Sequence, residues 1–217
     1  MTYTGQVVRG GPADVRTLPA LTIGKLAVGG LGNNAYLLRC PATGRQVLVD
    51  AAADAGGLLA MIGAGGLAAV VTTHRHDDHW QALAEIARAT GAACLAHEAD
   101  APGITGITAT LREGDRVPVG DAELEVIHLR GHTPGSIALL YQDPGGIAHL
   151  FTGDALFPGG VGATRGNAKN FRSLIDDVEH KIFDRLPDDT WFYPGHGDDS
   201  TLGAERPALP EWRVRGW

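Results

Sequence analysis

The sequence has few cysteines and no long apolar run. The two cysteines, Cys40 and Cys94, lie in apolar segments typical of strands, and we expect both to be buried, reduced thiols, as in a reducing cytosol. A membrane span needs about 18 consecutive apolar residues, and no stretch of the sequence comes close to that length. Residues 1–19 carry scattered charges and no apolar segment, so we expect no signal peptide and predict a cytoplasmic protein.

Positive charge and aromatic side chains are also scarce. The 18 basic residues are outnumbered by 25 acidic ones, which gives a formal charge of −7. Because phosphate binding needs a positive field, this balance argues against nucleic acid as a partner and favours a small-molecule substrate. Arginine greatly exceeds lysine, a bias typical of GC-rich bacterial genomes. Aromatics make up only 6% while glycine numbers 31, so we expect an aliphatic core with tight turns. Nothing in the sequence indicates the oligomeric state.

Apolar segments alternate with turn signals along all 217 residues, a length and composition that suit one globular domain over residues 1–217. Their order predicts an α/β protein with two mixed β-sheets and helices outside them. The predicted strands are 21–28, 35–38, 46–49, 68–73, 92–96, 122–129, 137–141, 147–152 and 191–193. The predicted helices are 55–63, 78–90 and 171–186.

The densest group of chemically active side chains is the hexapeptide His74-Arg75-His76-Asp77-Asp78-His79, directly after a buried strand. It offers four possible metal ligands, which are His74, His76, Asp78 and His79. A solvated polar turn is the alternative, but three histidines and two aspartates within six residues argue strongly against it.

Three further candidate ligands follow predicted strands, each directly after a glycine: His132, Asp154 and His196. Glycine allows a sharp turn that aims the next side chain. Each residue alone is equally well a turn histidine or a capping aspartate. Together with the hexapeptide, they complete a ligand set for two metal ions.

The H-x-H-x-D-H motif with this downstream His, Asp and His resembles the metallo-β-lactamase superfamily. The segments GHTPGS, FTGDALF and YPGHG resemble its glyoxalase II-like branch, the hydroxyacylglutathione hydrolases. The resemblance implies a four-layer αββα sandwich. It also implies two divalent metal ions, usually zinc, with iron or manganese as alternatives. The implied ligands are His74, His76 and His132 for the first metal, Asp78, His79 and His196 for the second, and Asp154 for both.

The implied activity is hydrolysis of a small thioester or ester by a hydroxide that bridges the metals, with Asp78 as the catalytic residue that orients it. The glutathione-binding helical domain of that branch has no counterpart in residues 197–217, and its basic residue is replaced at Ala163. We therefore expect a carrier other than glutathione. Candidate substrate contacts are Trp80, Phe157 and Arg165. Trp80 could equally pack at the helix start, and a simple surface position suits Arg165 as well.

The main alternative is an oxidoreductase with a single iron, similar to persulfide dioxygenases. A phosphodiesterase or ribonuclease fits the acidic charge poorly, and a non-catalytic metal-binding module fits the complete ligand set poorly. The remaining histidines, His97, His128, His149 and His180, lack the glycine-turn setting, and we expect structural or surface roles for them. We expect Trp212 and Trp217 to cover apolar surface, although this tail could instead line the substrate cleft.

Overall fold

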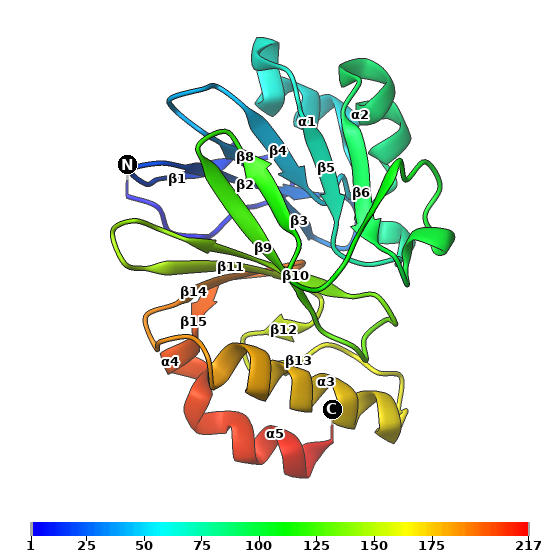
Figure 1. Ribbon diagram of the computed structural model, residues 1–217, viewed down its shortest axis with the longest axis vertical. Coiled ribbons are helices and arrows are strands. Elements are labelled where there is room, and N and C mark those ends of the chain that lie inside the picture. Colours follow the sequence, from blue (N-terminus) through cyan, green and yellow to red (C-terminus); the bar gives the residue numbers. More distant parts are fainter. Residues whose placement is uncertain (1, 217) are drawn as a thin grey trace.

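The computed structural model describes residues 2–216, and the first of its large sheets, visible in Figure 1, contains seven strands. These are β1 (Asp14–Thr17), β2 (Thr22–Val28), β3 (Asn33–Arg39), β4 (Gln46–Val49), β5 (Ala69–Thr72), β6 (Ala93–His97) and β7 (Ala109–Leu111), in that spatial order. Neighbours from β1 to β4 are antiparallel, and neighbours from β4 to β7 are parallel. The sheet is therefore mixed, as the sequence predicts.

The second large sheet has the spatial order β15-β14-β11-β10-β9-β8. Its strands are β8 (Arg116–Val119), β9 (Ala122–His128), β10 (Ile137–Gln142), β11 (Ala148–Gly153), β14 (Trp191–Pro194) and β15 (Ser200–Thr201). Only β11 and β14 pair in parallel. The short strands β12 (Leu156–Phe157) and β13 (Gly160–Val161) form a separate hairpin.

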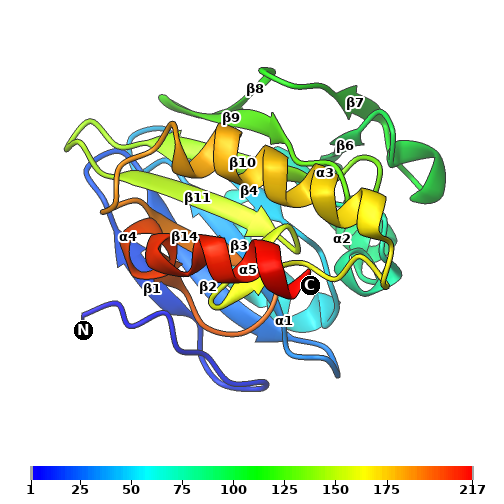
Figure 2. The same cartoon turned by 90° about the horizontal axis from the view of Figure 1, so that it is seen from below.

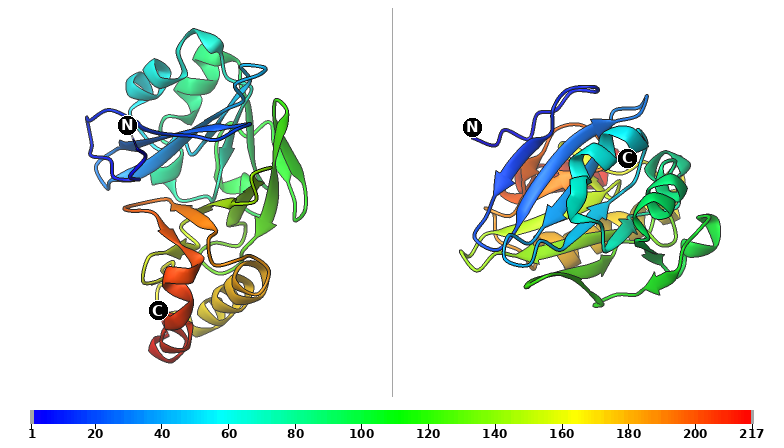
Figure 3. Two further views of the ribbon diagram at one scale, coloured as in Figure 1. Left: turned by 90° about the vertical axis from the view of Figure 1, so that its left-hand side faces the viewer. Right: turned by 90° about the horizontal axis from the view of Figure 1, so that it is seen from above.

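Helices cover the outer face of each sheet. Helices α1 (Ala55–Ile62) and α2 (Leu83–Thr90) pack on the first sheet, as the view from above shows (Figure 3). Helices α3 (Ala168–Val178) and α5 (Leu209–Arg215) lie side by side on the second, preceded in the case of α5 by α4 (Leu202–Glu205) (Figure 2). The predicted four-layer αββα sandwich is confirmed.

Period-two alternation along the strands separates three apolar layers. In β3, Tyr36 and Leu38 pack between the two sheets, while Leu37 faces the layer under α1 and α2. In β14, Tyr193 likewise faces the other sheet and Phe192 faces α3. Strands buried on both faces explain why the sequence shows nearly continuous apolar runs.

The predicted helix over 78–90 is wrong at its start. Asp77–His79 form one 3₁₀ turn. The φ of −145° at Trp80 is not helical and ends this turn before α2 begins at Leu83. The predicted helix over 171–186 continues beyond α3 only as a π-helical turn, Glu179–Phe183. The edge strands β1 and β7 and the β12–β13 hairpin were not predicted, because all are short and the two edge strands also carry polar residues.

The predictions for the two cysteines and for Trp212 agree with the structure. Cys40 and Cys94 are free and buried, as predicted. Trp212 is buried in the layer under α3 and α5, which confirms its packing role, whereas Trp217 lies outside the described residues. Within residues 2–216, no helix has both the length and the apolar character needed to traverse a lipid bilayer.

A fully buried lysine ties three distant segments together. The Lys25 ammonium donates to the carbonyls of Gly5 at 2.7 Å and Gly197 at 2.8 Å, and to Asp199 Oδ1 at 2.7 Å. Asp199 is also almost completely buried, and it accepts a further hydrogen bond from the Trp191 indole. Because every donor of Lys25 has an acceptor, the buried charge is compensated and fixes the loop after β14.

Replacing Lys25 by methionine should therefore lower the free energy of unfolding by about 3–5 kcal/mol, because it leaves the Asp199 carboxylate buried without a cation. Guanidinium chloride denaturation measures the change. The control is Lys181→Met, which removes a partly exposed pair with Glu113 and should cost about 1 kcal/mol or less. Equal losses in the two variants would contradict this account of Lys25.

Candidate metal centre

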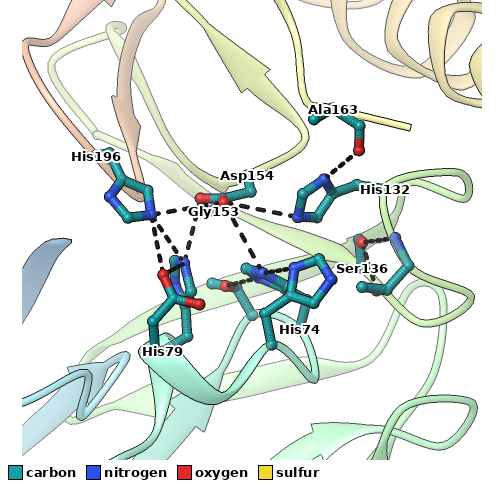
Figure 4. Close-up of polar contacts among 12 residues, drawn as sticks. His74, His79, His132, Ser136, Gly153, Asp154, Ala163 and His196 are labelled. Atoms are coloured by element: carbon teal, nitrogen blue, oxygen red, sulfur yellow. Dashed lines mark hydrogen bonds and ion pairs between the residues drawn. The ribbon is translucent and has the colours of Figure 1, made fainter. Parts of the chain in front are cut away.

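The sheet topology brings the seven predicted ligands to one edge of the sandwich. Both β9 and β11 run antiparallel to β10, and β14 runs parallel to β11, so all three end at the same edge of the second sheet. His132, Asp154 and His196 follow these three ends. In the facing sheet, β5 ends at Thr72 and leads into the hexapeptide 74–79. The loops of both sheets therefore converge (Figure 4).

The first group of donors consists of His74, His76 and His132, whose candidate ligand atoms lie within 4.8 Å of one another. His74 Nε2 is 3.0 Å from His76 Nδ1. The Asp154 Oδ2 atom lies 3.6 Å from His132 Nε2 and 4.0 Å from His74 Nε2. One cation at the centre of this group can thus be reached by three imidazoles and one carboxylate oxygen.

The second group consists of Asp78, His79 and His196. Asp78 Oδ2 is 3.4 Å from His196 Nε2 and 3.6 Å from His79 Nε2, and the two imidazole nitrogens are 3.3 Å apart. The Asp154 Oδ1 atom lies 3.4 Å from His79 Nε2. Figure 4 shows Asp154 between the histidines of the two groups. The structure therefore brings together all seven side chains in the predicted grouping.

Two buried polar atoms of the cluster make no hydrogen bond within the described chain. His132 Nε2 and Asp154 Oδ1 are buried and have no hydrogen-bond partner within the described chain. Such orphaned donors and acceptors are rare in folded proteins because they lose water without replacement. Both atoms face the cluster, where a cation would satisfy them. The donor set, imidazole nitrogens with carboxylate oxygens, fits divalent transition metals.

The ionisation of the cluster also suits metal ligands. Burial, reinforced by the neighbouring histidines, holds the pKa of His74 well below its usual value, so its imidazole is neutral. Burial likewise lowers the pKa of His132. Burial alone would raise the pKa of Asp154, but the surrounding His79, His196 and His132 outweigh it and lower that pKa. His74 and His132 are thus neutral imidazoles and Asp154 is an ionised carboxylate, the forms that bind metals.

Asp50 orients one histidine of each group. Its Oδ2 atom accepts a hydrogen bond from His79 Nδ1 at 2.8 Å and another from the Thr73 hydroxyl, also at 2.8 Å. That hydroxyl in turn lies 3.1 Å from His74 Nδ1, which donates to it. Burial would lower the pKa of His79, but Asp50 and Asp154 raise it to about 10. Asp50 adopts a left-handed φ of 58°, a strained conformation typical of functional positions.

Backbone carbonyls and one amide fix three more of the candidate ligands. His132 Nδ1 donates to the Ala163 carbonyl at 2.9 Å, and His196 Nδ1 donates to the Leu31 carbonyl at 3.2 Å. Since a carbonyl only accepts, both rings present Nε2 as the free ligand atom. The Asn33 amide donates to Asp78 Oδ2 at 2.9 Å and fixes that carboxylate.

Sequence reasoning did not identify Asp50, Thr73 or Asn33 as parts of the site. One signal was present for Asp50, which ends the strand 46–49 as the ligands end theirs. Nothing in the spacing, however, indicates which histidine it contacts.

The prediction that a glycine before a ligand allows a sharp turn is confirmed at Gly153, whose φ is 47°. At Gly195 the cause is space, because a Cβ there would collide with Asp154 Oδ1 and lie 2.7 Å from His79 Cε1.

The three predicted substrate contacts lie in different surroundings. Arg165 lines a cavity of about 630 Å³ beside His76 and His132, and its guanidinium lies 3.5 Å from His76 Nε2. The Phe157 ring is centred 6.4 Å from the His196 ring. Trp80 packs against the layer under α1 and α2 and is not among the residues that line this cavity. Substrate contact by all three residues stays a prediction.

The four remaining histidines lie outside the two groups of candidate ligands. The rings of His97 and His128 stack with centroids 3.9 Å apart. His149 is buried and bonds to the Tyr193 hydroxyl, and His180 bonds to the Asp176 carbonyl one helical turn earlier. These contacts agree with structural or surface roles.

Comparison with known proteins places this geometry in a family. Residues 28–200 match the Metallo-beta-lactamase superfamily. A hydroxyacylglutathione hydrolase from Fuscovulum blasticum is 44% identical over 132 residues, 60% of this chain and 50% of that protein. ETHE1 from Myxococcus xanthus has a TM-score of 0.77 and 29% identity, and covers 88% of this chain and 84% of its own. TTHA1623, solved in a di-iron-bound form, has a TM-score of 0.71 and 30% identity, with coverages of 84% and 96%.

The comparisons cover different shares of the chain and of the proteins it resembles. The chain spans about half the length of the first curated relatives it matches. The family match is broader, since it covers most of the chain and includes all seven candidate ligands. The chain therefore belongs to the metallo-beta-lactamase superfamily.

Proposed function

We propose that this protein is a metal-dependent hydrolase that cleaves a small thioester or ester, similar to glyoxalase II. The observation that carries the proposal is the convergence of two three-residue donor groups on the Asp154 carboxylate. The 44% identity to a protein named hydroxyacylglutathione hydrolase supports the same reaction class.

The proposed cofactor is a pair of divalent metal ions, zinc in the first place, with iron or manganese as alternatives. His74, His76 and His132 would hold one ion, Asp78, His79 and His196 the other, and Asp154 both. When bound, such a pair polarises a carbonyl and lowers the pKa of water to about 7. The di-iron-bound form of TTHA1623 supports a dinuclear centre without deciding the metal here.

Asp78 is the proposed catalytic residue. Its side chain is 20% exposed, and its Oδ2 atom faces the cluster under the restraint of the Asn33 amide. That oxygen can orient a water molecule and accept its proton as the water adds to the substrate carbonyl. The C–S bond of a thioester then breaks, and a carboxylic acid and a thiol are released. A thiolate leaves readily, so the step needs no strong general acid.

A single-iron oxidoreductase, similar to persulfide dioxygenases, is the second candidate. The observation that favours it is a two-histidine, one-carboxylate set within the cluster. His74 Nε2 lies 4.0 Å and His132 Nε2 lies 3.6 Å from Asp154 Oδ2. Such sets hold iron in non-haem oxygenases. The second donor group, Asp78, His79 and His196, has no role in that reading, and for this reason we favour the hydrolase.

The zinc-loaded protein should hydrolyse S-lactoylglutathione or simpler acyl thioesters, with release of thiol measured by a thiol-reactive dye. Metal content per chain is measured on the same sample. Absence of turnover on every acyl thioester and ester tested would refute the hydrolase. One iron per chain together with oxygen uptake on glutathione persulfide would establish the alternative.

The Asp154→Asn variant should retain about one metal ion per chain or fewer, against about two in the parent, because an amide oxygen is a poorer bridge than a carboxylate. Elemental analysis after dialysis gives the number. Asp143→Asn, in the turn between β10 and β11, is the matched control and should keep the parent content. Two tightly held ions in Asp154→Asn would exclude the bridging role.

The Asp50→Asn variant should bind metal about 10–100-fold more weakly, because it disturbs the hydrogen bonds that orient His74 and His79. Competition with a chromophoric chelator measures the affinity. The control is Asp54→Asn, because Asp54 also has a positive φ (52°) but only caps α1. An unchanged affinity in Asp50→Asn would show that Asp50 serves the fold alone.

A further inference from the structure

Asp100 is a completely buried aspartate whose side chain contacts distant loops. It occupies the N-cap position of a 3₁₀ turn, Ala101–Gly103. An aspartate at the start of a helical turn commonly accepts a hydrogen bond from that turn. Asp100 makes no such bond, and its carboxylate instead accepts from residues 25, 33 and 35 positions away in the chain. Its role therefore lies outside its own segment.

The first of these distant contacts is with the hexapeptide 74–79. Asp100 Oδ2 accepts a hydrogen bond at 3.0 Å from the backbone amide of Arg75. Arg75 stands between the candidate ligands His74 and His76 in the chain. Its guanidinium is farther away, with Nε 4.0 Å from Asp100 Oδ1, and its side chain is about half exposed. The amide is thus the main contact, and it restrains the backbone that carries both histidines.

The second contact is with loop 131–136, which carries His132. The Thr133 hydroxyl donates to Asp100 Oδ2, and the Gly135 amide donates to Asp100 Oδ1 at 2.8 Å. Ser136 supports this arrangement, because its hydroxyl accepts from the Thr133 amide at 3.0 Å and lies 2.7 Å from the Thr133 hydroxyl. His132 is therefore restrained through the residue that follows it.

The close approach of Asp100 to this loop requires the glycine at position 135. A Cβ on Gly135 would lie 2.6 Å from the Asp100 amide nitrogen and 2.8 Å from the Asp100 Cβ and Cγ atoms, which is closer than real Cβ contacts. The backbone conformation is not the reason, since Gly135 has no left-handed φ. The glycine in the segment GHTPGS thus makes room for Asp100.

Asp100 joins the two sheets at the first donor group only. The hexapeptide follows β5 of the first sheet, and loop 131–136 lies between β9 and β10 of the second. Within residues 2–216, no hydrogen bond of the Asp100 carboxylate reaches the ligand group Asp78, His79 and His196. The distance between the segment 74–76 and His132, which come from different sheets, depends on this one carboxylate.

We infer that Asp100 is a positioning residue for the first metal ion, because it sets the distance between the segment 74–76 and His132. The inference rests on the proposed metal-dependent function and assigns a residue to one half of its centre. Imidazole nitrogens must converge to about 2.0–2.2 Å from a zinc ion, so a displaced loop weakens binding. Asp50 differs from Asp100, since its hydrogen bonds serve one histidine of each group.

The test replaces the carboxylate by an amide of the same shape. In Asp100→Asn, the side-chain NH₂ faces at least one N–H or O–H donor, so at least one of the three hydrogen bonds is lost. The bond from the Ile137 amide to the Thr73 carbonyl, at 3.0 Å, joins the same loops and remains, so we expect the variant to fold. The affinity of the first group for Zn²⁺ should fall about tenfold, measured by competition with a chromophoric chelator.

Two backgrounds separate the donor groups. His196→Ala removes a ligand of the second group, and adding Asp100→Asn to it should lower the affinity for Zn²⁺ about tenfold. His132→Ala removes a ligand of the first group, and adding Asp100→Asn to it should change the affinity less than about twofold. A similar loss in both backgrounds would show that Asp100 serves only the fold, and no loss in His196→Ala would overturn the inference as well.

Asp14→Asn is the matched control. The Asp14 carboxylate also accepts from one threonine hydroxyl and two backbone amides, those of Thr4 and Gly5, but it lies on the edge strand β1. Asp14→Asn should keep the parent affinity in both backgrounds.

A second pair of variants decides the matter even if Asp100→Asn does not fold. Thr133→Val removes one donor to Asp100 with little change in volume, and it should lower the affinity of the first group for Zn²⁺ by a few-fold in the His196→Ala background. Thr133→Ser keeps the hydroxyl and should restore the parent affinity. Equal affinities in the two variants would contradict the positioning role.

These measurements do not depend on turnover. If Asp100→Asn weakens the first group alone while the parent hydrolyses no thioester or ester, the proposed activity fails and the positioning role stands. If the parent is an active hydrolase and the affinity of the first group is unchanged in Asp100→Asn, only the positioning role fails.

Discussion

The buried carboxylate of Asp154 is the constraint on which the rest of the structure depends. It lies between two groups of histidines with only 13% of its side chain exposed, and one of its oxygens has no hydrogen-bond partner in the described chain. An ionised group in such a place costs several kcal/mol unless positive charge surrounds it. His74 is held neutral and supplies no charge, whereas the raised pKa of His79 gives Asp154 one positive neighbour, 3.4 Å away. The two donor groups around Asp154 suit cations, and the missing side chain at Gly195 leaves room for Asp154 and His79 themselves.

The sandwich supplies the rigidity that such a centre requires. Most of its candidate ligands follow the ends of the buried strands β5, β11 and β14, so their backbones are fixed before any ligand binds. Further polar contacts then set each side chain. Asp50 links one histidine of each donor group, and Lys25 holds the loop that carries His196 through the Gly197 carbonyl. Burial makes both contacts strong, because water does not compete for the same hydrogen bonds. A metal site built this way depends on the residues that orient its ligands as well as on the ligands themselves.

Charge is distributed unevenly, and this distribution bears on function. The chain is acidic overall, yet Arg165 and Lys169 meet at a cavity without carboxylates of their own. A local positive field beside the candidate metal centre attracts anions even when the net charge is negative. Arg130 contributes differently, since its bidentate pair with Asp177 makes it part of the wall.

The sequence by itself determined the layered α/β fold and the identity of the seven candidate ligands, because strand periodicity and the spacing of His74 to His79 are local properties of the chain. It was less successful where the outcome depends on distant contacts. The 3₁₀ turn at Asp77–His79 replaced a predicted helix start, since the side chains there are drawn toward the cluster and not toward a helix face. Only the tertiary structure decided that Asp50 orients His79, that Lys25 reaches Gly197, and that Arg165 and Lys169 share one cavity. These pairs join residues that are near in space and, in most cases, far apart in the chain, and no local pattern records which partner a buried polar group will meet.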